Sequence, residues 1–176
     1  DISTVVLGKT LKYRFMKLLY KKIISSSIHI FAYSSYVRYN IQTLFNNNSI
    51  ENISLLSIGM DVENFTNSQF TLHKDFTPKN DQIILFSICR HIERKGLINL
   101  IDSLKLLDKK NNNWHQYIAG VGPLTTKLKK RVNDLGLSQS ITFLGRISES
   151  ELHGCYKKSD IFLLPNMILD NGDADG

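Results

Sequence analysis

The strongest constraint in this sequence is a series of short, continuous apolar runs in its second half. They lie at 83–88, 114–120, 140–145 and 160–165, and segments with helical spacing of apolar residues separate them. A strand that is apolar on both faces is typical of a parallel sheet covered by helices. The helical segments supply the crossovers that parallel neighbours need. We therefore expect an α/β fold with a Rossmann-like parallel sheet and flanking helices.

The helices between these runs are marked by apolar stripes and by their start signals. One stripe covers 97–107 and a second covers 124–135. A shorter helix is expected over 149–158, where Ser148 and Glu151 have the spacing of a capping box. Capping is therefore the expected role of that pair.

The amino-terminal part shows a weaker alternation of the same kind. A helical pattern over 9–24 precedes an apolar run at 28–32, and a helix ending near Phe45 precedes a second run at 53–58. This order predicts helix, strand, helix and strand.

A polar stretch separates the two parts. Residues 66–81 have no apolar periodicity and contain one proline, as linkers do. We expect residues 1–66 to end one domain, 67–81 to be a linker and 82–176 to be an incomplete ligand-binding domain.

The net charge narrows the classes of partner, and the cysteine content indicates the compartment. The 176 residues carry a net charge of +6, which suits a phosphorylated ligand, an anionic membrane surface or a nucleic acid. No aromatic-basic interleaving of the type that binds single-stranded nucleic acid is present, so nucleic-acid binding is not expected. Cys89 and Cys155 form neither a disulfide framework nor a metal-ligand pattern, which fits the cytoplasm.

Ligands of doubly wound sheets bind outside the carboxyl ends of the strands, so the segments there hold the candidate site. Arg90 follows the first strand, and Lys95 and Gly96 open the next helix. Cationic side chains beside a helix amino terminus are typical of an anion site. A solvated basic loop is the alternative interpretation.

The next two strand ends are rich in glycine. Gly120, Gly122 and Pro123 form a turn with two of the three glycines of the dinucleotide fingerprint. They allow either close approach of a ligand or a purely structural turn. Gly145 and Arg146 end the third strand, and Arg146 is either a ligand contact or a surface charge.

Taken in order, these motifs resemble the nucleotide-sugar domain of the family 4 glycosyltransferases, which are retaining enzymes of the GT-B fold. The resemblance spans about 25–170, with FAYSSYVRYNI and SIGMDVENF matching the end of the first domain and its hinge. The matching segments of the second domain are Cys89–Gly96, Ala119–Leu124, Gly136–Arg146 and Glu151–Pro165.

The resemblance implies transfer of a sugar from a nucleoside diphosphate sugar, with retention, in polysaccharide or glycolipid synthesis. Arg90 and Lys95 would stabilise the leaving diphosphate. The turn at Gly120 would approach the nucleotide, as would Gly96, Gly122 and Pro123. The main chain at Gly145, Arg146 and Ile147 would face the base.

The resemblance also bears on cofactors, acceptor and location. It implies that the donor is a substrate and that no metal is bound. The first domain would bind a sugar or a lipid-linked acceptor, at a cytoplasmic membrane face. The basic, aromatic segment 9–22 is compatible with peripheral membrane contact, and an ordinary surface helix explains it equally well.

Several positions depart from the family pattern. Cys89 stands where glycine or alanine is usual, and His91 where leucine is usual. We interpret His91 as a packed or solvated residue in preference to an acid–base group. The family's Glu-x7-Glu element would begin at Asp175 or beyond Gly176. We expect the chain to be a piece of a longer protein, and we expect this piece to be inactive by itself.

Rival interpretations come from other functional classes. An NAD(P)-dependent Rossmann oxidoreductase would use GVGPLT, with Arg146 contacting a 2′-phosphate. A nucleotide-binding remnant without turnover is a non-enzymatic alternative. A nucleotide-sugar epimerase of the same two-domain architecture fits the motif series less well.

Overall fold

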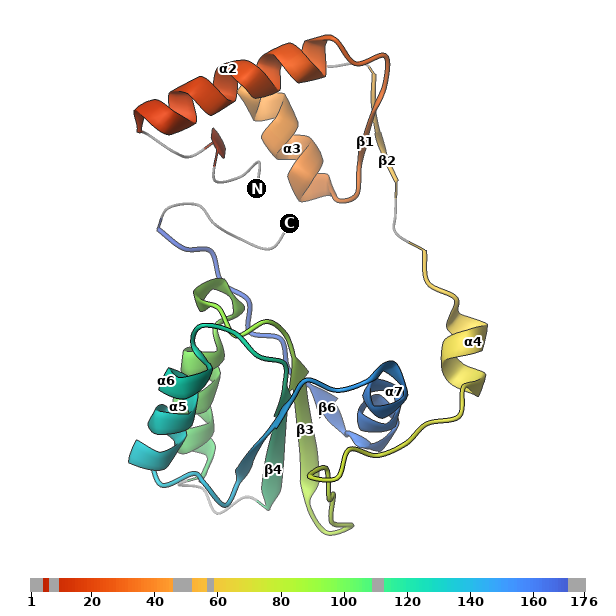
Figure 1. Ribbon diagram of the computed structural model, residues 1–176, viewed down its shortest axis with the longest axis vertical. Coiled ribbons are helices and arrows are strands. Elements are labelled where there is room, and N and C mark those ends of the chain that lie inside the picture. Colours follow the sequence, from red (N-terminus) through yellow and green to blue (C-terminus); the bar gives the residue numbers. More distant parts are fainter. Residues whose placement is uncertain (1–4, 7–9, 46–51, 57–58, 109–112, 171–176) are drawn as a thin grey trace. The chain divides into compact units, whose positions relative to one another are not determined.

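The computed structural model shows two compact units (Figure 1). One contains Asp1–Met60 and Met167–Gly176, and the other contains Asp61–Asn166. The residues that the structure describes are 5–6, 10–45, 52–56, 59–108 and 113–170. Each unit is treated separately below. In this described part of the chain, no helix is both long and apolar enough to cross a membrane.

The first unit alternates helices and strands. It contains α2 (Leu11–Ser25), β1 (Ile30–Ala32), α3 (Ser35–Leu44) and β2 (Ile53–Leu55), and the two strands pair in parallel. Its core is a small cluster formed by Ile24, Ala32, Ile41, Leu44 and Ile53. The hydroxyl of Ser34 accepts a hydrogen bond from the Val37 amide at 3.1 Å, which caps α3.

The second unit is built on a four-stranded parallel sheet. Its strands are β3 (Ile83–Ile88), β4 (Trp114–Ala119), β5 (Ile141–Gly145) and β6 (Ile161–Phe162), in the order β5-β4-β3-β6. The helices are α4 (Val62–Asn67), α5 (Leu97–Asp108), α6 (Thr125–Asp134) and α7 (Glu149–Lys158), with a short 3₁₀ turn, η1, at Glu93–Lys95. The α/β prediction is confirmed.

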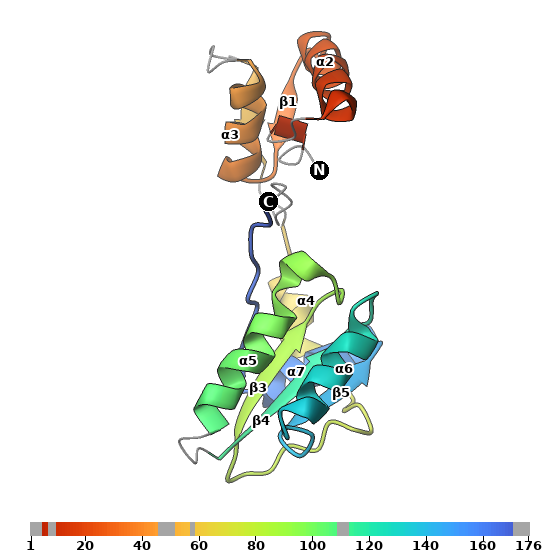
Figure 2. The ribbon, with the colours of Figure 1, turned by 90° about the vertical axis from the view of Figure 1, so that its left-hand side faces the viewer.

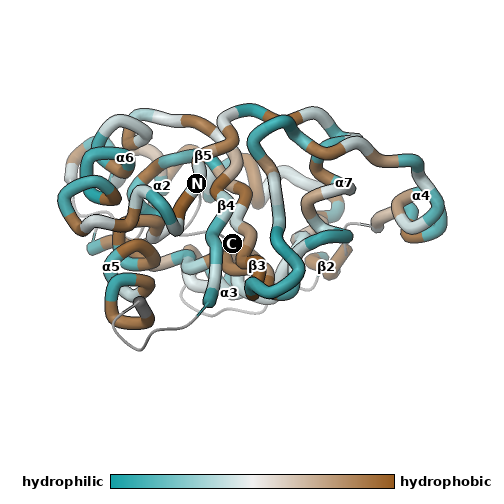
Figure 3. Tube along the Cα trace, turned by 90° about the horizontal axis from the view of Figure 1, so that it is seen from below, coloured by the Kyte–Doolittle hydropathy of each residue, from teal (hydrophilic) through white to brown (hydrophobic). Residues whose placement is uncertain are grey.

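Helices cover both faces of this sheet, and Figure 2 shows α5 and α6 together on one of them. On that face Leu85, Ile101, Ile118 and Leu128 belong to the larger core cluster. On the face of α7, Phe86, Tyr117 and Cys155 belong to a second cluster. Figure 3 shows β3 as a hydrophobic run and α6 as largely hydrophilic. Burial on both faces thus explains the apolar runs of β3 and β4, whereas Ile161 and Phe162 of β6 are exposed.

The segment that we expected to be a linker contacts α7. The Thr71 amide donates to the Ser150 hydroxyl at 3.0 Å, and a Cβ at Gly154 would meet the Thr71 carbonyl oxygen at 2.3 Å. Phe76 is 2% exposed and lies in the second core cluster. This polar stretch therefore packs on the second unit without forming a strand or a helix beyond α4.

Candidate active site

The strand order places a topological switch point at β3. This strand pairs with β4 on one side and with β6 on the other, and all three run in parallel. The chain proceeds from β3 through α5 to β4, whereas it reaches β6 only after α7. Segments that leave neighbouring strands at such a point diverge and form a crevice where ligands bind. The candidate site therefore lies at the carboxyl ends of β3 and its neighbours.

The segment after β3 combines two cations with a helix amino terminus. Arg90 is exposed, Lys95 is half-buried in η1, and α5 begins at Leu97. Among the described residues, none forms a hydrogen bond or ion pair with the Arg90 guanidinium. The amides of the first turn of α5 and the helix dipole favour an anion at this end. An anion site at this strand end therefore stays a prediction, beside the alternative of a solvated basic loop.

Gly96 packs this segment against Pro165, which follows β6. Its φ of 64° is left-handed, and a Cβ at this position would lie 1.9 Å from the carbonyl oxygen of Pro165. Only glycine allows both the conformation and the approach without strain. Gly96 thereby holds Lys95 and the start of α5 against the last strand.

The two glycines after β4 are required by packing between loops. A Cβ at Gly120 would lie 2.0 Å from the Cys89 carbonyl oxygen, and one at Gly122 would lie 2.5 Å from that of His91. The amide of His91 donates to the Val121 carbonyl at 3.2 Å. The loops after β3 and β4 are thus packed against each other, which gives these glycines a structural role whether or not they also adjoin a ligand.

His91 lies inside this junction and is fully buried. Its Nδ1 is 2.9 Å from Oγ1 of Thr125, while its Nε2 has no hydrogen-bond partner among the described residues. Burial lowers the pKa of His91 and Lys129 lowers it further, whereas the Ala119 carbonyl opposes them. A buried, preferentially neutral imidazole fits our interpretation of His91 as a packed residue.

Thr125 is a site residue that the sequence did not reveal. Its hydroxyl accepts from the Gly122 amide at 2.9 Å and lies 2.8 Å from the Gly122 carbonyl oxygen. Together with the contact to His91, these bonds fix the turn that precedes α6. A threonine near a glycine turn has many ordinary roles, and its partner 34 residues earlier left no local signal.

The third strand end is open. Gly145 has a φ of 72°, and a Cβ there would meet nothing within 4 Å. Its carbonyl oxygen accepts from the Gly120 amide at 2.6 Å, so this segment is tied to the β4 turn. Arg146 is exposed, as is Pro123 of that turn, and Ile147 is half-buried. Ser148 and Glu151 form the expected capping box of α7.

Two buried polar side chains link β4 and β3 to the segment that follows β6. The Ser87 hydroxyl donates to the Leu163 carbonyl at 2.7 Å, and the Gln116 amide donates to Ser87 at 3.2 Å. Both side chains are fully buried. They were not identified from the sequence, because each lies inside a run that was interpreted as a buried apolar strand. Asp175, our candidate for the sugar-binding carboxylate, lies outside the described residues.

Comparison with known proteins identifies relatives of this chain. The model of the family "Glycosyl transferases group 1" matches residues 68–168. The amylovoran biosynthesis glycosyltransferase AmsK of Erwinia amylovora is 27% identical over 127 residues, which are 72% of this chain and 30% of that protein. The chain therefore matches under a third of the length of this curated relative.

Solved structures share the fold. A glycosyltransferase from Rickettsia africae has a TM-score of 0.70 and 19% identity, over 90% of this chain and 42% of its own. HepE of Anabaena, solved in complex with UDP and glucose, has a TM-score of 0.64 and 14% identity, over 89% and 43% respectively. These likenesses confirm the expected fold class, a Rossmann-like sheet of the GT-B kind.

Proposed function

The chain belongs to the group 1 glycosyl transferases, and we propose that its second unit binds the diphosphate of a nucleoside diphosphate sugar. The observation that carries this proposal is the junction at the switch point. There Arg90, Lys95 and the amino terminus of α5 follow the carboxyl end of β3, and Gly96 is packed against Pro165. Two cations beside a helix amino terminus favour an anionic ligand group such as a diphosphate.

In the proposed reaction these groups stabilise the departing nucleotide. The bond between the anomeric carbon and the diphosphate oxygen breaks, and the acceptor oxygen bonds to that carbon as its hydroxyl releases a proton. Negative charge grows on the diphosphate, where Arg90 and Lys95 are placed to neutralise it. We propose that the anomeric configuration is retained, that the sugar is a hexose and that the two cations do this without a bound metal.

The remaining contacts are proposed from the strand ends that adjoin the cationic segment. The turn at Gly120, Gly122 and Pro123 would face the nucleotide, and the main chain from Gly145 through Arg146 to Ile147 would face the base. The open space around Gly145 supports this assignment. Asp175 is proposed to contact the donor sugar.

The relatives guide the choice of substrates. The UDP and glucose held by HepE support UDP as the first nucleotide to test. The relative named for amylovoran biosynthesis supports a role in polysaccharide or glycolipid synthesis. We propose that residues 1–66 belong to a domain for a sugar or lipid-linked acceptor at the cytoplasmic membrane face, and that 82–176 belong to the donor domain.

The test is nucleotide binding by this chain, measured by ligand-observed NMR with UDP, GDP and ADP. Arg90→Ala and Lys95→Ala should each weaken binding about tenfold or more, since a charge-assisted hydrogen bond contributes roughly 1.5–3 kcal/mol. Lys130→Ala is the matched control, because Lys130 is an exposed cation of α6. It should leave the affinity within about twofold of the parent.

Two further arms separate this proposal from its rivals. NADPH should not displace the bound nucleotide, whereas displacement would favour the oxidoreductase interpretation. EDTA should leave UDP binding unchanged, whereas loss of binding would show that a metal ion binds the diphosphate. Equal weakening by Lys130→Ala would contradict the site itself.

A further inference from the structure

His91 contacts two neighbouring segments at the carboxyl edge of the four-stranded sheet. Its amide donates to the Val121 carbonyl at 3.2 Å, and its carbonyl accepts from the Leu124 amide at 3.1 Å. Its ring packs against Phe143 of β5, with ring centroids 6.0 Å apart and ring planes at 69°. The residue that directly follows Arg90 is therefore held by the turn after β4 and by β5.

The ring of His91 is joined to the glycine turn through a single hydroxyl group. Nδ1 of His91 lies 2.9 Å from Oγ1 of Thr125, and that oxygen lies 2.9 Å from the Gly122 amide nitrogen and 2.8 Å from the Gly122 carbonyl oxygen. A hydroxyl has one proton to donate and two lone pairs with which to accept. When Thr125 donates to the Gly122 carbonyl, it accepts both from the Gly122 amide and from His91 Nδ1–H, so all three bonds form together. We call this arrangement the His91–Thr125 bridge.

Burial makes the geometry of this bridge strict. His91 is fully buried, and its Nε2 has no hydrogen-bond partner among the described residues, so the bond to Thr125 orients the ring. Removal of the Thr125 hydroxyl would leave Nδ1 buried beside an apolar group, which is costly for a polar atom. We therefore expect the two loops to rearrange when the bridge is lost.

We infer that His91 and Thr125 are positioning residues of the donor site, and that their bridge sets the affinity for a nucleoside diphosphate. The bridge holds the cationic segment that begins at Arg90 against the turn at Gly122, and we have proposed that both face the same nucleotide. A ligand that contacts two segments is bound tightly only when supporting contacts preserve the spacing of those segments. This role rests on the proposed function and deepens it.

The opposite end of the same sheet provides a matched control pair. Nε2 of His115 lies 2.9 Å from Oγ1 of Thr142, which is the distance found between His91 and Thr125. His115 lies near the start of β4 and Thr142 near the start of β5, whereas the candidate site lies at the carboxyl ends of the strands. Both pairs should contribute to stability, but only the His91–Thr125 bridge should affect nucleotide affinity.

The test is a double-mutant cycle on the UDP affinity of the whole chain, measured by NMR titration. His91→Leu and Thr125→Val should each weaken UDP binding about fivefold, and the double variant should weaken it little further, because either change removes the same bridge. His115→Leu, Thr142→Val and their double variant should each bind UDP within about twofold of the parent. Additive effects in the first cycle, or equal losses in the second, would overturn the proposal.

A conservative variant separates positioning from general stability. The affinities are compared at a temperature at which circular dichroism shows every variant to be folded. Thr125→Ser keeps the hydroxyl and should bind UDP within about twofold of the parent, whereas Thr125→Val should not. Should His91→Leu fail to fold, this comparison of serine with valine decides alone. Equal weakening by the two variants would overturn the proposal.

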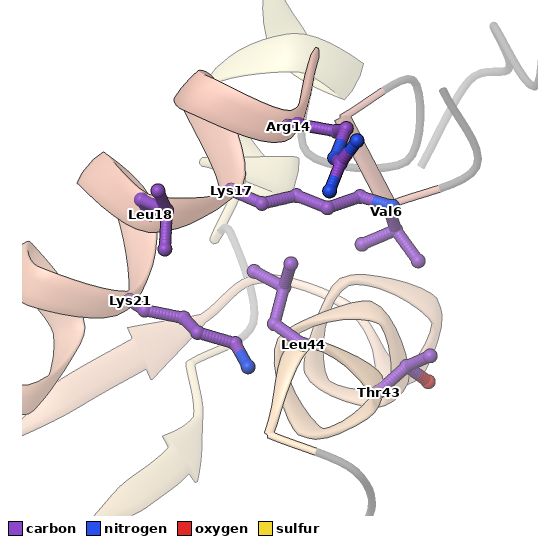
Figure 4. A pocket seen from close by; sticks show the side chains of 7 residues that line it. All are labelled: Val6, Arg14, Lys17, Leu18, Lys21, Thr43 and Leu44. Atoms are coloured by element: carbon purple, nitrogen blue, oxygen red, sulfur yellow. The ribbon is translucent and has the colours of Figure 1, made fainter. Parts of the chain in front are cut away.

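A basic hollow in the first unit is the rival location for an anionic ligand such as UDP. This hollow of about 500 Å³ is lined in part by Arg14, Lys17 and Lys21, which Figure 4 shows on α2. Lys17→Gln should leave the UDP affinity within about twofold of the parent. A loss equal to that caused by Thr125→Val would place UDP in the hollow and overturn the proposal.

Failure of the bridge and failure of the donor site give different results. UDP binding that Arg90→Ala weakens and Thr125→Val leaves unchanged would overturn the role of the bridge alone. Absence of UDP binding by the folded parent would overturn the proposed function, and the role of the bridge with it.

Discussion

A Cβ atom at Gly96 would lie 1.9 Å from the carbonyl oxygen of Pro165, so the segment after β3 and the end of β6 meet at a point that only glycine permits. Gly96→Ala should therefore lower the free energy of unfolding by roughly 3 kcal/mol, combining left-handed strain with a collision against backbone. Urea denaturation followed by the fluorescence of Trp114, the single tryptophan, measures this loss.

Gly136→Ala is the matched control for that prediction. Gly136 has a similar φ of 69°, and a Cβ there would meet nothing within 4 Å. It should cost only the left-handed strain, about 1–2 kcal/mol. Equal losses in the two variants would show that the contact between Gly96 and Pro165 does not constrain the site.

The buried His91 predicts acid sensitivity of the second unit. Burial lowers its pKa in the folded state, so the unfolded chain, with a pKa of about 6.5, binds the proton more readily. The stability gained from the neutral imidazole is complete above that value and is lost as the pH falls. The urea midpoint from Trp114 fluorescence should therefore decrease below it, and His91→Leu should flatten the decrease.

Part of the slope should persist in His91→Leu, because burial and Lys79 also lower the pKa of His115. A parent whose midpoint is constant between pH 5 and 7 would contradict this account of His91.

Cys155 should resist alkylation while the chain is folded. Its thiol is fully buried in the core, and burial raises its pKa to about 11. About one thiol in a thousand is then ionised at pH 8, and that thiolate is inaccessible. In a Cys89→Ser variant, iodoacetamide should label Cys155 only after urea is added, as mass spectrometry of the intact chain would detect. Rapid labelling without urea would contradict the packing of α7.

Local sequence determined the main elements of the second unit. The strand at 83–88 and the helix at 149–158 were predicted to the residue, because an uninterrupted apolar run and a capping box are local signals. The run at 160–165 yields a strand only over Ile161–Phe162, and the run at 53–58 yields one over Ile53–Leu55. Strand length depends on the neighbour with which a run pairs, which the run itself does not encode.

Sequence likewise predicts only part of the candidate site. The positions of Arg90 after a strand and of Lys95 before a helix were predicted from sequence, because strand ends and helix starts are local signals. The contacts that hold them are not: Gly96 meets Pro165, and His91 meets Thr125, across long intervals of the chain. Whether a glycine serves a turn, a neighbouring loop or a ligand is decided by such contacts. For Gly120 the first partner is the Cys89 carbonyl.

The most direct test of the central claim is to map UDP binding residue by residue with ¹H–¹⁵N correlation spectra. The account predicts that UDP shifts the amide signals of Gly96 and Leu97, and those of Gly145 and Arg146. Arg90→Ala should reduce these shifts at a UDP concentration that half-saturates the parent. Shifts confined to other segments, or none at saturating UDP in a chain whose spectrum shows that it is folded, would contradict a diphosphate site at these strand ends.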